Sequence, residues 1–400
     1  MVLSSVPAEE LRGHRVLVRV DYNVPIENGT VTDDTRIRAT LPTLHHIMNA
    51  GGRAVLVSHL GRPKGTWRDD MSIAPAAERL GELLDGKVRF VRDIVGAEAH
   101  AAADELRAGQ VLMLENVRFL AGEEMNDPNL SEALAAFGDI YVNDAFGSAH
   151  RAHASTSGVV EVMKQLGRRA VAGLLLEREL RFLGDALENP DRPFTAILGG
   201  AKISGKLDVI DNLLPRVDRL LIGGAMANTF FRALGLETGK SLVEGERVDM
   251  ARELLRRAED RIVLPVDCVT AAEAKAGTET RVVDRDDVAA DASILDIGPR
   301  SVAVFRDFIE HSRTILWNGP MGLFEIDVFA AGTQGLAHAV ADAARAGAVT
   351  IAGGGDTVSA IEAAGVAGQL THVSTGGGAT LEFLEGRTLP GVAILDNARP

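Results

Sequence analysis

The feature that most constrains this chain is the alternation of short apolar runs with longer helical patterns along its 400 residues. Several runs are apolar almost throughout, which is typical of parallel strands buried on both faces. We expect strands at residues 15–20, 54–57, 111–114, 140–142, 195–198, 220–222, 262–266, 294–297, 314–317 and 349–352. Repeated strand–helix units predict an α/β fold, in which ligands collect at the carboxyl ends of the strands.

Helical periods lie between these runs. Apolar residues recur at i, i+4, i+7 and i+11 in segments 37–48 and 203–214, so each segment predicts a helix with one apolar stripe. A longer helical stretch at about 169–187 is followed by the proline-containing breaker 188–193. The loops that follow strands carry arginine, histidine and aspartate before this point and glycine after it. This change predicts two domains with different ligands.

Composition limits the setting of the protein. The one cysteine, Cys268, allows no intrachain disulfide and is more typical of a small buried apolar residue than of a nucleophile. No signal peptide and no apolar run near ~20 residues is visible, so we expect a cytoplasmic protein. The net charge of −14 argues against nucleic acid and membrane partners. Small phosphorylated ligands stay possible, because the local field in a cleft decides their binding.

Glycine follows five strand candidates in the second half of the chain, at 199–200, 223–224, 319, 353–355 and 376–378. One such junction alone is usually an ordinary tight turn. Five at one sheet edge favour an extended nucleotide site, because glycine admits a ligand close to the backbone and helix N–H groups favour phosphate.

Two common nucleotide motifs are incomplete. Residues 200–207 have the glycine and lysine spacing of a P-loop, but Leu207 stands where a hydroxyl would hold Mg²⁺. No G-x-G-x-x-G opens a helix after a strand. A P-loop nucleotidase and a dinucleotide dehydrogenase are therefore weak hypotheses.

Several residues near the glycine turns each fit two interpretations, one as a ligand contact and one as an ordinary structural residue. Lys202 and Lys206 are two of only seven lysines and stand at i and i+4 at an expected helix start, so we favour phosphate contact over a solvated surface pair. Asp356 fits either a Mg²⁺ contact or a helix N-cap, and both can hold at once. Ser374 and Thr375 can simply cap the last short helix.

Charged and polar residues follow the strands of the first half, in segments 19–25, 58–63, 114–119 and 143–153. A single arginine there is usually a surface ion-pair partner, but several at one sheet edge predict an anion pocket, because guanidinium groups match phosphate and carboxylate. Asp21 and Asn23 would accept hydrogen bonds from substrate hydroxyls. The histidines do not have zinc-ligand spacing.

Six segments together resemble the phosphoglycerate kinase family, in order and over the whole chain. They are RVDYNVP at 19–25, SHLGRP at 58–63, GGAK at 199–202, WNGPMG at 317–322, GGGDT at 353–357 and STGGG at 374–378. Tyr22 stands where phenylalanine is usual, and Ile-Ser-Gly-Lys follows Lys202.

The resemblance implies two Rossmann-like three-layer α/β domains with parallel sheets, joined by a helix and a hinge. The first would be a 3-phosphoglycerate-binding domain at residues 1–168, with the C-terminal tail, about 387–400, packing back on it. The second would be a nucleotide-binding domain at 169–386, which includes the linker helix at about 169–187. The family further suggests a monomer.

The resemblance also implies the reaction, a phosphotransfer with a carboxyl group as acceptor in glycolysis and gluconeogenesis. A phosphoryl group would pass reversibly between 1,3-bisphosphoglycerate and ADP, giving 3-phosphoglycerate and ATP, by Mg²⁺-dependent in-line transfer after hinge closure. The implied substrate-binding residues are Asp21, Asn23, Arg36, His59, Arg62, Arg118 and Arg151. The implied nucleotide-binding residues are Lys202, Lys206, Gly298, Asn318, Glu325, Gly353, Gly354, Gly355, Asp356 and Thr357.

Some of these residues have a more specific implied role. Glu325 would contact the ribose and Asp356 the magnesium ion. The catalytic residues at the transferring group would be Arg36 and Lys202, assisted by free amides at 376–378, of which Gly376 and Gly377 are the main ones.

Two other classes of function stay open at this point. A two-domain binding protein that captures a phosphorylated metabolite without chemistry would bind no MgADP in a calorimetric titration. An NAD-dependent dehydrogenase would change the fluorescence of NADH.

Overall fold

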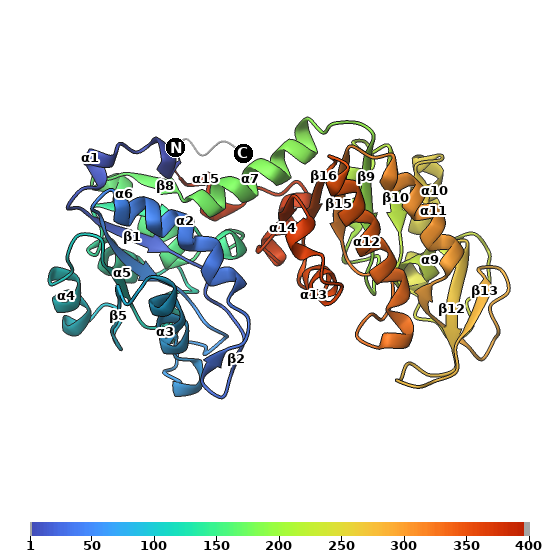
Figure 1. Cartoon of the computed structure of the whole chain (residues 1–400), viewed down its shortest axis with the longest axis horizontal. Coiled ribbons are helices and arrows are strands. Elements are labelled where there is room, and N and C mark those ends of the chain that lie inside the picture. Colours follow the sequence, from blue (N-terminus) through green and yellow to red (C-terminus); the bar gives the residue numbers. More distant parts are fainter. Residues whose placement is uncertain (1, 396–400) are drawn as a thin grey trace. The chain divides into compact units, whose positions relative to one another are not determined.

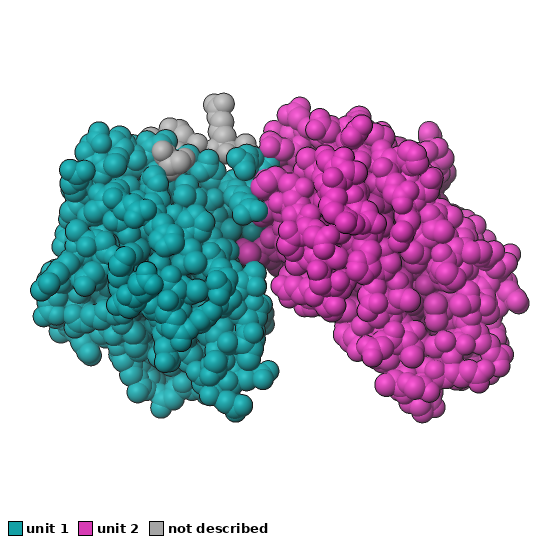
Figure 2. Space-filling model, in the orientation of Figure 1, with its two compact units in different colours: residues 1–181, 388–400 teal, residues 182–387 magenta. Residues whose placement is uncertain are grey.

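The computed structural model describes residues 2–395, without the side chain of Ser4. The chain forms two compact units, shown in different colours in Figure 2. Unit 1 consists of residues 1–181 and 388–400, and unit 2 of residues 182–387. Unit 1 therefore takes residues from both ends of the chain.

Unit 1 is built on a six-stranded sheet with the strand order β5-β6-β4-β1-β7-β8 (Figure 1). All neighbouring strands are parallel. The strands are β1 (Arg15–Arg19), β4 (Arg53–Val57), β5 (Val88–Phe90), β6 (Val111–Met113), β7 (Ile140–Asn143) and β8 (Ala170–Ala172). Because they are parallel, their carboxyl ends lie at one edge of the sheet.

Helices cover this sheet. They are α1 (Ala8–Leu11), α2 (Thr35–Asn49), α3 (Ala74–Leu83), α4 (Ala97–Asp104), α5 (Pro128–Ala135), α6 (Val159–Gln165), α15 (Pro390–Ala393) and the first part of α7 (Leu174–Glu188). A short hairpin of β2 (Ile26–Glu27) and β3 (Thr30–Val31) follows β1.

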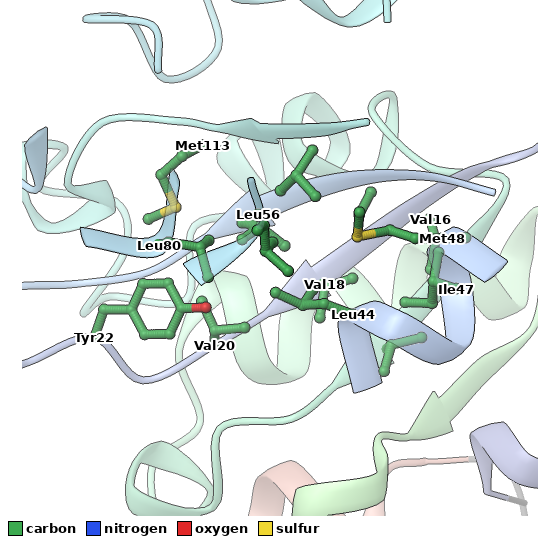
Figure 3. Close-up of a cluster of buried hydrophobic side chains, with 14 of the residues drawn as sticks. Val16, Val18, Val20, Tyr22, Leu44, Ile47, Met48, Leu56, Leu80 and Met113 are labelled. Carbon is green, nitrogen blue, oxygen red and sulfur yellow. The ribbon is translucent and has the colours of Figure 1, made fainter. Parts of the chain in front are cut away.

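The hydrophobic core of unit 1 lies on both faces of the sheet. On one face, Val18 of β1 and Leu56 of β4 pack with Leu44 of α2 in a cluster of buried side chains (Figure 3). The alternate residues Leu17 and Val55 are also fully buried, and they point to the opposite face. Burial on both faces requires a layer of structure on each side of the sheet.

Unit 2 has a second parallel sheet, with the order β11-β10-β9-β15-β16-β17. Its strands are β9 (Phe194–Leu198), β10 (Arg219–Ile222), β11 (Ile262–Val263), β15 (Thr314–Asn318), β16 (Val349–Ala352) and β17 (His372–Val373). Its helices are α8 (Leu207–Leu213), α9 (Met226–Ala233), α10 (Val248–Ala258), α11 (Pro299–Glu310), α12 (Ala331–Arg345), α13 (Gly355–Ala363) and α14 (Gly378–Leu384). Trp317 of β15 packs in one buried cluster with Phe305 of α11 and Leu336 of α12.

The α/β fold with parallel sheets is confirmed, and unit 2 adds an element that the sequence did not predict. This is a small antiparallel sheet in the order β13-β12-β14, with β12 (Asp267–Ala271), β13 (Arg281–Asp284) and β14 (Ser293–Ile297). The strand expected at 294–297 therefore lies outside the parallel sheet. The strand expected at 262–266 ends at Val263.

The helix expected at 169–187 begins later, at Leu174. Residues 170–172 form β8, because their backbone pairs with β7 in the register Tyr141↔Ala170. Three residues with no clear period carry no signal of this pairing. The unit boundary falls inside α7, after Arg181, and differs from the expected division after residue 168.

The helix expected from residue 203 begins at Leu207. Gly205 disfavours a helix, and Ser204 bonds elsewhere, since its amide donates to Oε2 of Glu244 at 3.0 Å. Lys202 and Lys206 therefore do not stand one turn apart on a helix, contrary to the prediction.

The end of the described chain lies in unit 1. The amide of Gly391 donates to the carbonyl oxygen of Ala149 at 2.9 Å, and Nδ2 of Asn143 donates to the carbonyl oxygen of Gly391 at 2.9 Å. Residues 396–400 of the expected tail lie outside the described residues. Between residues 2 and 395, no helix combines the length and apolar character that crossing a bilayer needs.

Asp144 holds the start of α7. Its buried Oδ1 accepts hydrogen bonds from the amides of Leu175 at 2.9 Å and Leu176 at 3.3 Å. Gly173 lies so close that a Cβ there would come 2.2 Å from Oδ1. The carboxyl group thus caps amides that would otherwise be unsatisfied at the first turn of the helix.

We expect the stability of unit 1 to depend on pH through Asp144. Burial raises the pKa of Asp144 to about 7, whereas in the unfolded chain it is about 3.9. Between these values the folded state holds a proton that the unfolded state releases, so stability falls as pH rises through this interval. Asp144→Asn removes this term. Its melting temperature relative to that of the unchanged chain should rise from pH 5 to 8, which corresponds to a relative gain in stability of at most about 3 kcal/mol.

Asp93→Asn is the matched control. Asp93 caps α4 through the amides of Gly96 and Ala99, and although burial acts to raise its pKa, these amides lower it below 3.8. It stays ionised in both states above pH 5, so this variant should lose stability by the same amount across the interval. A trend for Asp93→Asn equal to that for Asp144→Asn would contradict the prediction.

Candidate functional site

Four neighbouring strands of unit 1 bring predicted substrate residues to one sheet edge. Asp21 follows β1, His59 follows β4, Arg118 lies after β6 and Arg151 after β7. The order β6-β4-β1-β7 makes these strands adjacent. Residues from 21 to 151 therefore meet in space because the strands are parallel.

Hydrogen bonds connect several of the predicted residues. Nη1 of Arg36 donates to Oδ1 of Asp21 at 3.3 Å and to the carbonyl oxygen of Asn23 at 3.1 Å. Oδ1 of Asn23 accepts from the amide of Gly61 at 2.9 Å, and the carbonyl oxygen of Gly61 accepts from Nη1 of Arg118 at 2.8 Å. One network thus holds Asp21, Asn23, Arg36 and Arg118.

Arg62 and Arg151 are exposed at the ends of their loops. Nε of Arg151 lies 3.1 Å from Nε2 of His150. Arg151 is also close enough to Arg118 to affect it: burial lowers the pKa of Arg118, and the charges of Arg19 and Arg151 lower it further. Several positively charged side chains therefore lie at this edge. Arg62 and Arg151 are exposed, and Arg118 is partly buried.

Arg19 lies at the centre of this edge and was not among the predicted site residues. It is fully buried, its Nε donates to Oγ of Ser155 at 2.8 Å, and its Nη2 lies 3.1 Å from Nδ1 of His59. Ser155 in turn donates through Oγ to Oε1 of the buried Glu123 at 2.6 Å. A charged residue that ends an apolar strand was the only sequence signal, and Glu123 and Ser155 gave none.

The positive charges at this edge lower the pKa values of both Asp21 and His59. Burial acts to raise the pKa of Asp21, but His59 in its protonated form and the charges of Arg36 and Arg19 lower it below 3.8. Burial lowers the pKa of His59 well below 6.5, against the attraction of Asp21, and Arg19 and Arg118 lower it further. Near neutral pH, Asp21 is therefore an anion and His59 a neutral imidazole.

We expect the imidazole ring of His59 not to titrate between pH 5.5 and 8. NMR of the ring carbons, assigned with His59→Gln, measures this directly. His311 is the internal control, because its backbone contact with Asp307 and the charge of that carboxylate raise its pKa above 6.5. A titration of His59 in step with His311 would contradict the burial and charge found at this edge.

In unit 2, all five glycine junctions follow strands of the same parallel sheet, namely β9, β10, β15, β16 and β17. The backbones of the loops after β9, β10 and β15 touch. A Cβ at Gly199 would lie 2.0 Å from the carbonyl oxygen of Pro320, and one at Gly224 would lie 2.5 Å from the amide nitrogen of Gly200. Glycine is therefore required for packing between these loops, whatever ligand they hold.

Two predicted nucleotide residues join β15 to β16. Nδ2 of Asn318 donates to the carbonyl oxygen of Gly353 at 2.7 Å, and Oγ1 of Thr357 accepts from the amide of Gly319 at 2.6 Å. Both side chains are buried. They hold the two glycine loops in place beside the candidate site.

A cavity of about 410 Å³ opens beside these loops. Of the predicted nucleotide residues, Glu325 and Asp356 line it. Lys202, Lys206, Gly298, Asn318, Gly353 to Gly355 and Thr357 lie outside its lining. The lining that the sequence did not predict includes Asn228, Phe231, Cys268, Ser293, Asp296, Met321 and Leu323.

The antiparallel sheet explains why part of the lining was missed. Ser293 and Asp296 belong to β14, which the sequence suggested as another parallel strand. Cys268 of β12 is 1% exposed, and burial raises the pKa of its thiol to about 12, as expected of a small buried residue. Gly298 caps α11, and a Cβ there would come 2.3 Å from the carboxyl carbon of Asp267.

The two scarce lysines differ in their surroundings. Lys202 is exposed, and its charge helps to lower the pKa of Glu244, against the effect of burial. Burial lowers the pKa of Lys206 to about 8, while Asp356 and Glu385 act in the opposite direction. Lys206 therefore lies close enough to Asp356, which lines the cavity, for the two charges to interact.

Asp356 is the second residue of α13, and Gly354 occupies the N-cap position. The N-cap interpretation of Asp356 is therefore wrong. Its exposed carboxylate is a hard oxygen donor at the cavity, which suits Mg²⁺ that arrives with nucleotide phosphates. Among residues 2–395 no cluster of three histidine, cysteine or acidic side chains could hold a metal by itself.

The amides at 376–378 are not all free, contrary to the prediction. The amide of Gly376 donates to Oγ of Ser374 at 3.1 Å, and Ser374 also bonds Thr380 at 2.7 Å. Ser374 thus holds the turn before α14 but does not cap the helix, whose N-cap is Gly377, so the capping interpretation is wrong. Gly377 has φ +49° and occupies the N-cap position of α14.

Comparison with known proteins agrees with these observations. The family model for phosphoglycerate kinase matches residues 6–387. The phosphoglycerate kinase of Chlorobium chlorochromatii is 53% identical over 390 residues, which cover 96% of this chain and 97% of that protein. The phosphoglycerate kinase of Synechococcus elongatus is 51% identical over 400 residues, with 99% and 98% covered.

Solved structures show the same likeness. The phosphoglycerate kinase from Coxiella burnetii has a TM-score of 0.87 and 40% identity, with 98% of each chain covered. The one from Pyrococcus horikoshii has a TM-score of 0.85 and 33% identity, with 99% of this chain and 98% of that chain covered. The protein is thus a kinase built from α/β units. It belongs to the phosphoglycerate kinase family, and the resemblance seen in the sequence is confirmed.

Proposed function

We propose that this protein transfers a phosphoryl group reversibly between 1,3-bisphosphoglycerate and ADP, with Mg²⁺, giving 3-phosphoglycerate and ATP. The observation that carries the proposal is the pair of sheet edges. One gathers arginines with a carboxylate and an amide, and the other gathers glycine loops, two lysines and a carboxylate. Membership of the phosphoglycerate kinase family supplies the identity of the substrates. The reaction belongs to glycolysis and gluconeogenesis, and the acceptor is a carboxyl group.

The edge of unit 1 supports binding of the triose acid. Arg36, Arg62, Arg118 and Arg151 would neutralise its phosphate and carboxylate, since guanidinium groups pair with both. Asp21 and Asn23 would accept hydrogen bonds from its hydroxyl. The neutral His59 would donate or accept a hydrogen bond without adding charge.

The edge of unit 2 supports binding of the nucleotide. The base and ribose would occupy the cavity, with Glu325 at the ribose, and the phosphates would lie toward Lys202, Lys206 and the loop 353–357. Asp356 would hold Mg²⁺, which neutralises phosphate charge when it is bound. Gly376 and Gly377 would take part only through amides that the turn leaves available. Gly298 and Asn318 would act by holding the neighbouring loops.

Phosphoryl transfer needs alignment and neutralised charge more than covalent help. The proposed substrates bind on different units, so a hinge motion would bring them into line and exclude water. Arg36 and Lys202 would then contact the transferring group. One chain supplies both sets of residues, so we further propose that the active form is a monomer. We also propose that the protein is cytoplasmic.

A coupled assay of ATP-dependent phosphorylation of 3-phosphoglycerate tests the proposal. Titration calorimetry with MgADP adds a second test, because a protein that only captures a phosphorylated metabolite would give no heat. Turnover without Mg²⁺ equal to turnover with it would overturn the magnesium dependence. No phosphorylation of 3-phosphoglycerate at saturating MgATP would overturn the reaction itself.

We expect Lys202→Ala and Arg36→Ala each to lower kcat about 10²- to 10³-fold, because each removes a charge that faces the transferring group. Two matched controls remove a charge of the same kind in the same unit. Lys240→Ala removes an exposed lysine of unit 2, and Arg38→Ala removes a neighbour of Arg36 on α2 that pairs with Asp34 at 2.8 Å. Circular dichroism checks that all four variants fold. A kcat near that of the controls would contradict the assigned roles.

We also expect the KM for MgADP to rise as pH increases through about 8. Lys206 has a pKa lowered to about 8, so above this pH it loses the charge that attracts phosphate. Lys206→Arg keeps its charge at all these pH values and should shift the rise to higher pH. Initial rates from pH 7 to 9.5 measure this, and an unchanged profile in Lys206→Arg would contradict the role of this residue.

A further inference from the structure

Asp296 is a buried carboxylate in the wall of the cavity that the predicted nucleotide residues only partly account for. It lies in β14 and is 2% exposed. Its Oδ1 accepts from the amide of Ile297 at 2.8 Å, and its Oδ2 accepts from the amide of Gly332 at 2.7 Å. Asp296 thus joins the antiparallel sheet to the first turn of α12.

This bond replaces an ordinary helix cap. Ala330, the N-cap residue of α12, offers no side-chain hydrogen bond to the helix. Asp296 reaches the first turn from another element and takes this role. Close packing makes the contact specific: a Cβ at Gly322 would lie 2.2 Å from Oδ1 of Asp296, and one at Gly332 would lie 2.3 Å from it.

The two glycines lie at the ends of the loop segment 322–332, whose last two residues begin α12. At its base the amide of Met321 donates to Oγ1 of Thr333 at 3.0 Å, beside the carboxylate of Asp296. Along its first half the amide of Leu323 donates to the carbonyl oxygen of Leu295 at 2.9 Å. The loop is therefore closed at its base, and Asp296 fills the space within that base.

Glu325 lies in this loop, exposed at the cavity. The backbone of the loop carries the exposed Glu325 side chain. The position of the loop therefore sets which part of the cavity the carboxylate can reach. We propose that Asp296 is a positioning residue, which holds the loop 322–332 so that Glu325 meets the ribose hydroxyls of a nucleoside diphosphate. This inference rests on the proposed function.

The electrostatic setting supports this role. Burial raises the pKa of Asp296 to about 7, and the amides of Gly332 and Ile297 act to lower it. Cys268 on β12, whose pKa burial raises to about 12, is close enough to be affected by the charge of Asp296, and Glu325 and Asp356 line the same cavity. Backbone amides, and not a cationic side chain, therefore stabilise the charge of Asp296. Replacement by asparagine keeps the volume and weakens these bonds.

The test compares ADP with 2′,3′-dideoxy-ADP, both with Mg²⁺, in the full chain. Titration calorimetry measures the dissociation constants of both nucleotides. ADP should bind about tenfold more tightly than the dideoxy nucleotide when Glu325 is in place. In Asp296→Asn the ratio of the two dissociation constants should approach one, as in Glu325→Gln. The double variant should show no further change.

This ratio separates positioning from general damage, since a loosened cavity would weaken both nucleotides equally. Asp127→Ala, which removes the side-chain cap of α5 in unit 1, is the control and should keep the ratio. Should Asp296→Asn fail to fold, Thr333→Val opens the other bond at the base of the loop and should lower the ratio.

Three results would overturn the inference. They are an unchanged ratio in a folded Asp296→Asn, an unchanged ratio in Glu325→Gln, and additive losses in the double variant. If the unaltered chain bound neither nucleotide, the proposed function would fail as well, and that outcome differs from the other three.

Discussion

The parallel pairing of strands is the constraint on which the rest of the structure depends. It places the carboxyl ends of β6, β4, β1 and β7 at one edge of unit 1, and those of β10, β9, β15 and β16 at one edge of unit 2. Buried strands need apolar side chains on both faces, so polar chemistry is confined to the loops after them. The loops at each edge can therefore carry different residues while the sheets keep the same architecture.

The two edges specialise by different means. In unit 1, side chains form the site, and the buried guanidinium of Arg19 contacts His59 and bonds Ser155, which in turn bonds Glu123. In unit 2, backbone forms much of the site, and glycine allows strand-end loops to touch, as at Gly199 and Gly224. Burying the charge of Arg19 without a partner would be costly. Hydrogen bonds to the guanidinium and the opposite charge of Glu123 balance this cost.

Two buried carboxylates hold the starts of helices in place by accepting hydrogen bonds from backbone amides. Asp144 holds the first turn of α7, and Asp296 holds the first turn of α12. Each accepts from backbone amides and lies against a glycine, Gly173 or Gly332. The same small arrangement therefore fixes the start of a helix at two important places in the fold.

The sequence by itself determined the α/β class, most of the strands and the family, because apolar period and strand-end motifs are local signals. It also located Asp21, Lys206 and Asp356 near strand ends. Only the tertiary structure decided that 170–172 is a strand, that α8 starts at Leu207 and that β14 joins an antiparallel sheet. It alone revealed Arg19 with Glu123, and Asp296 with Gly332, because contacts between residues distant in sequence leave no local pattern.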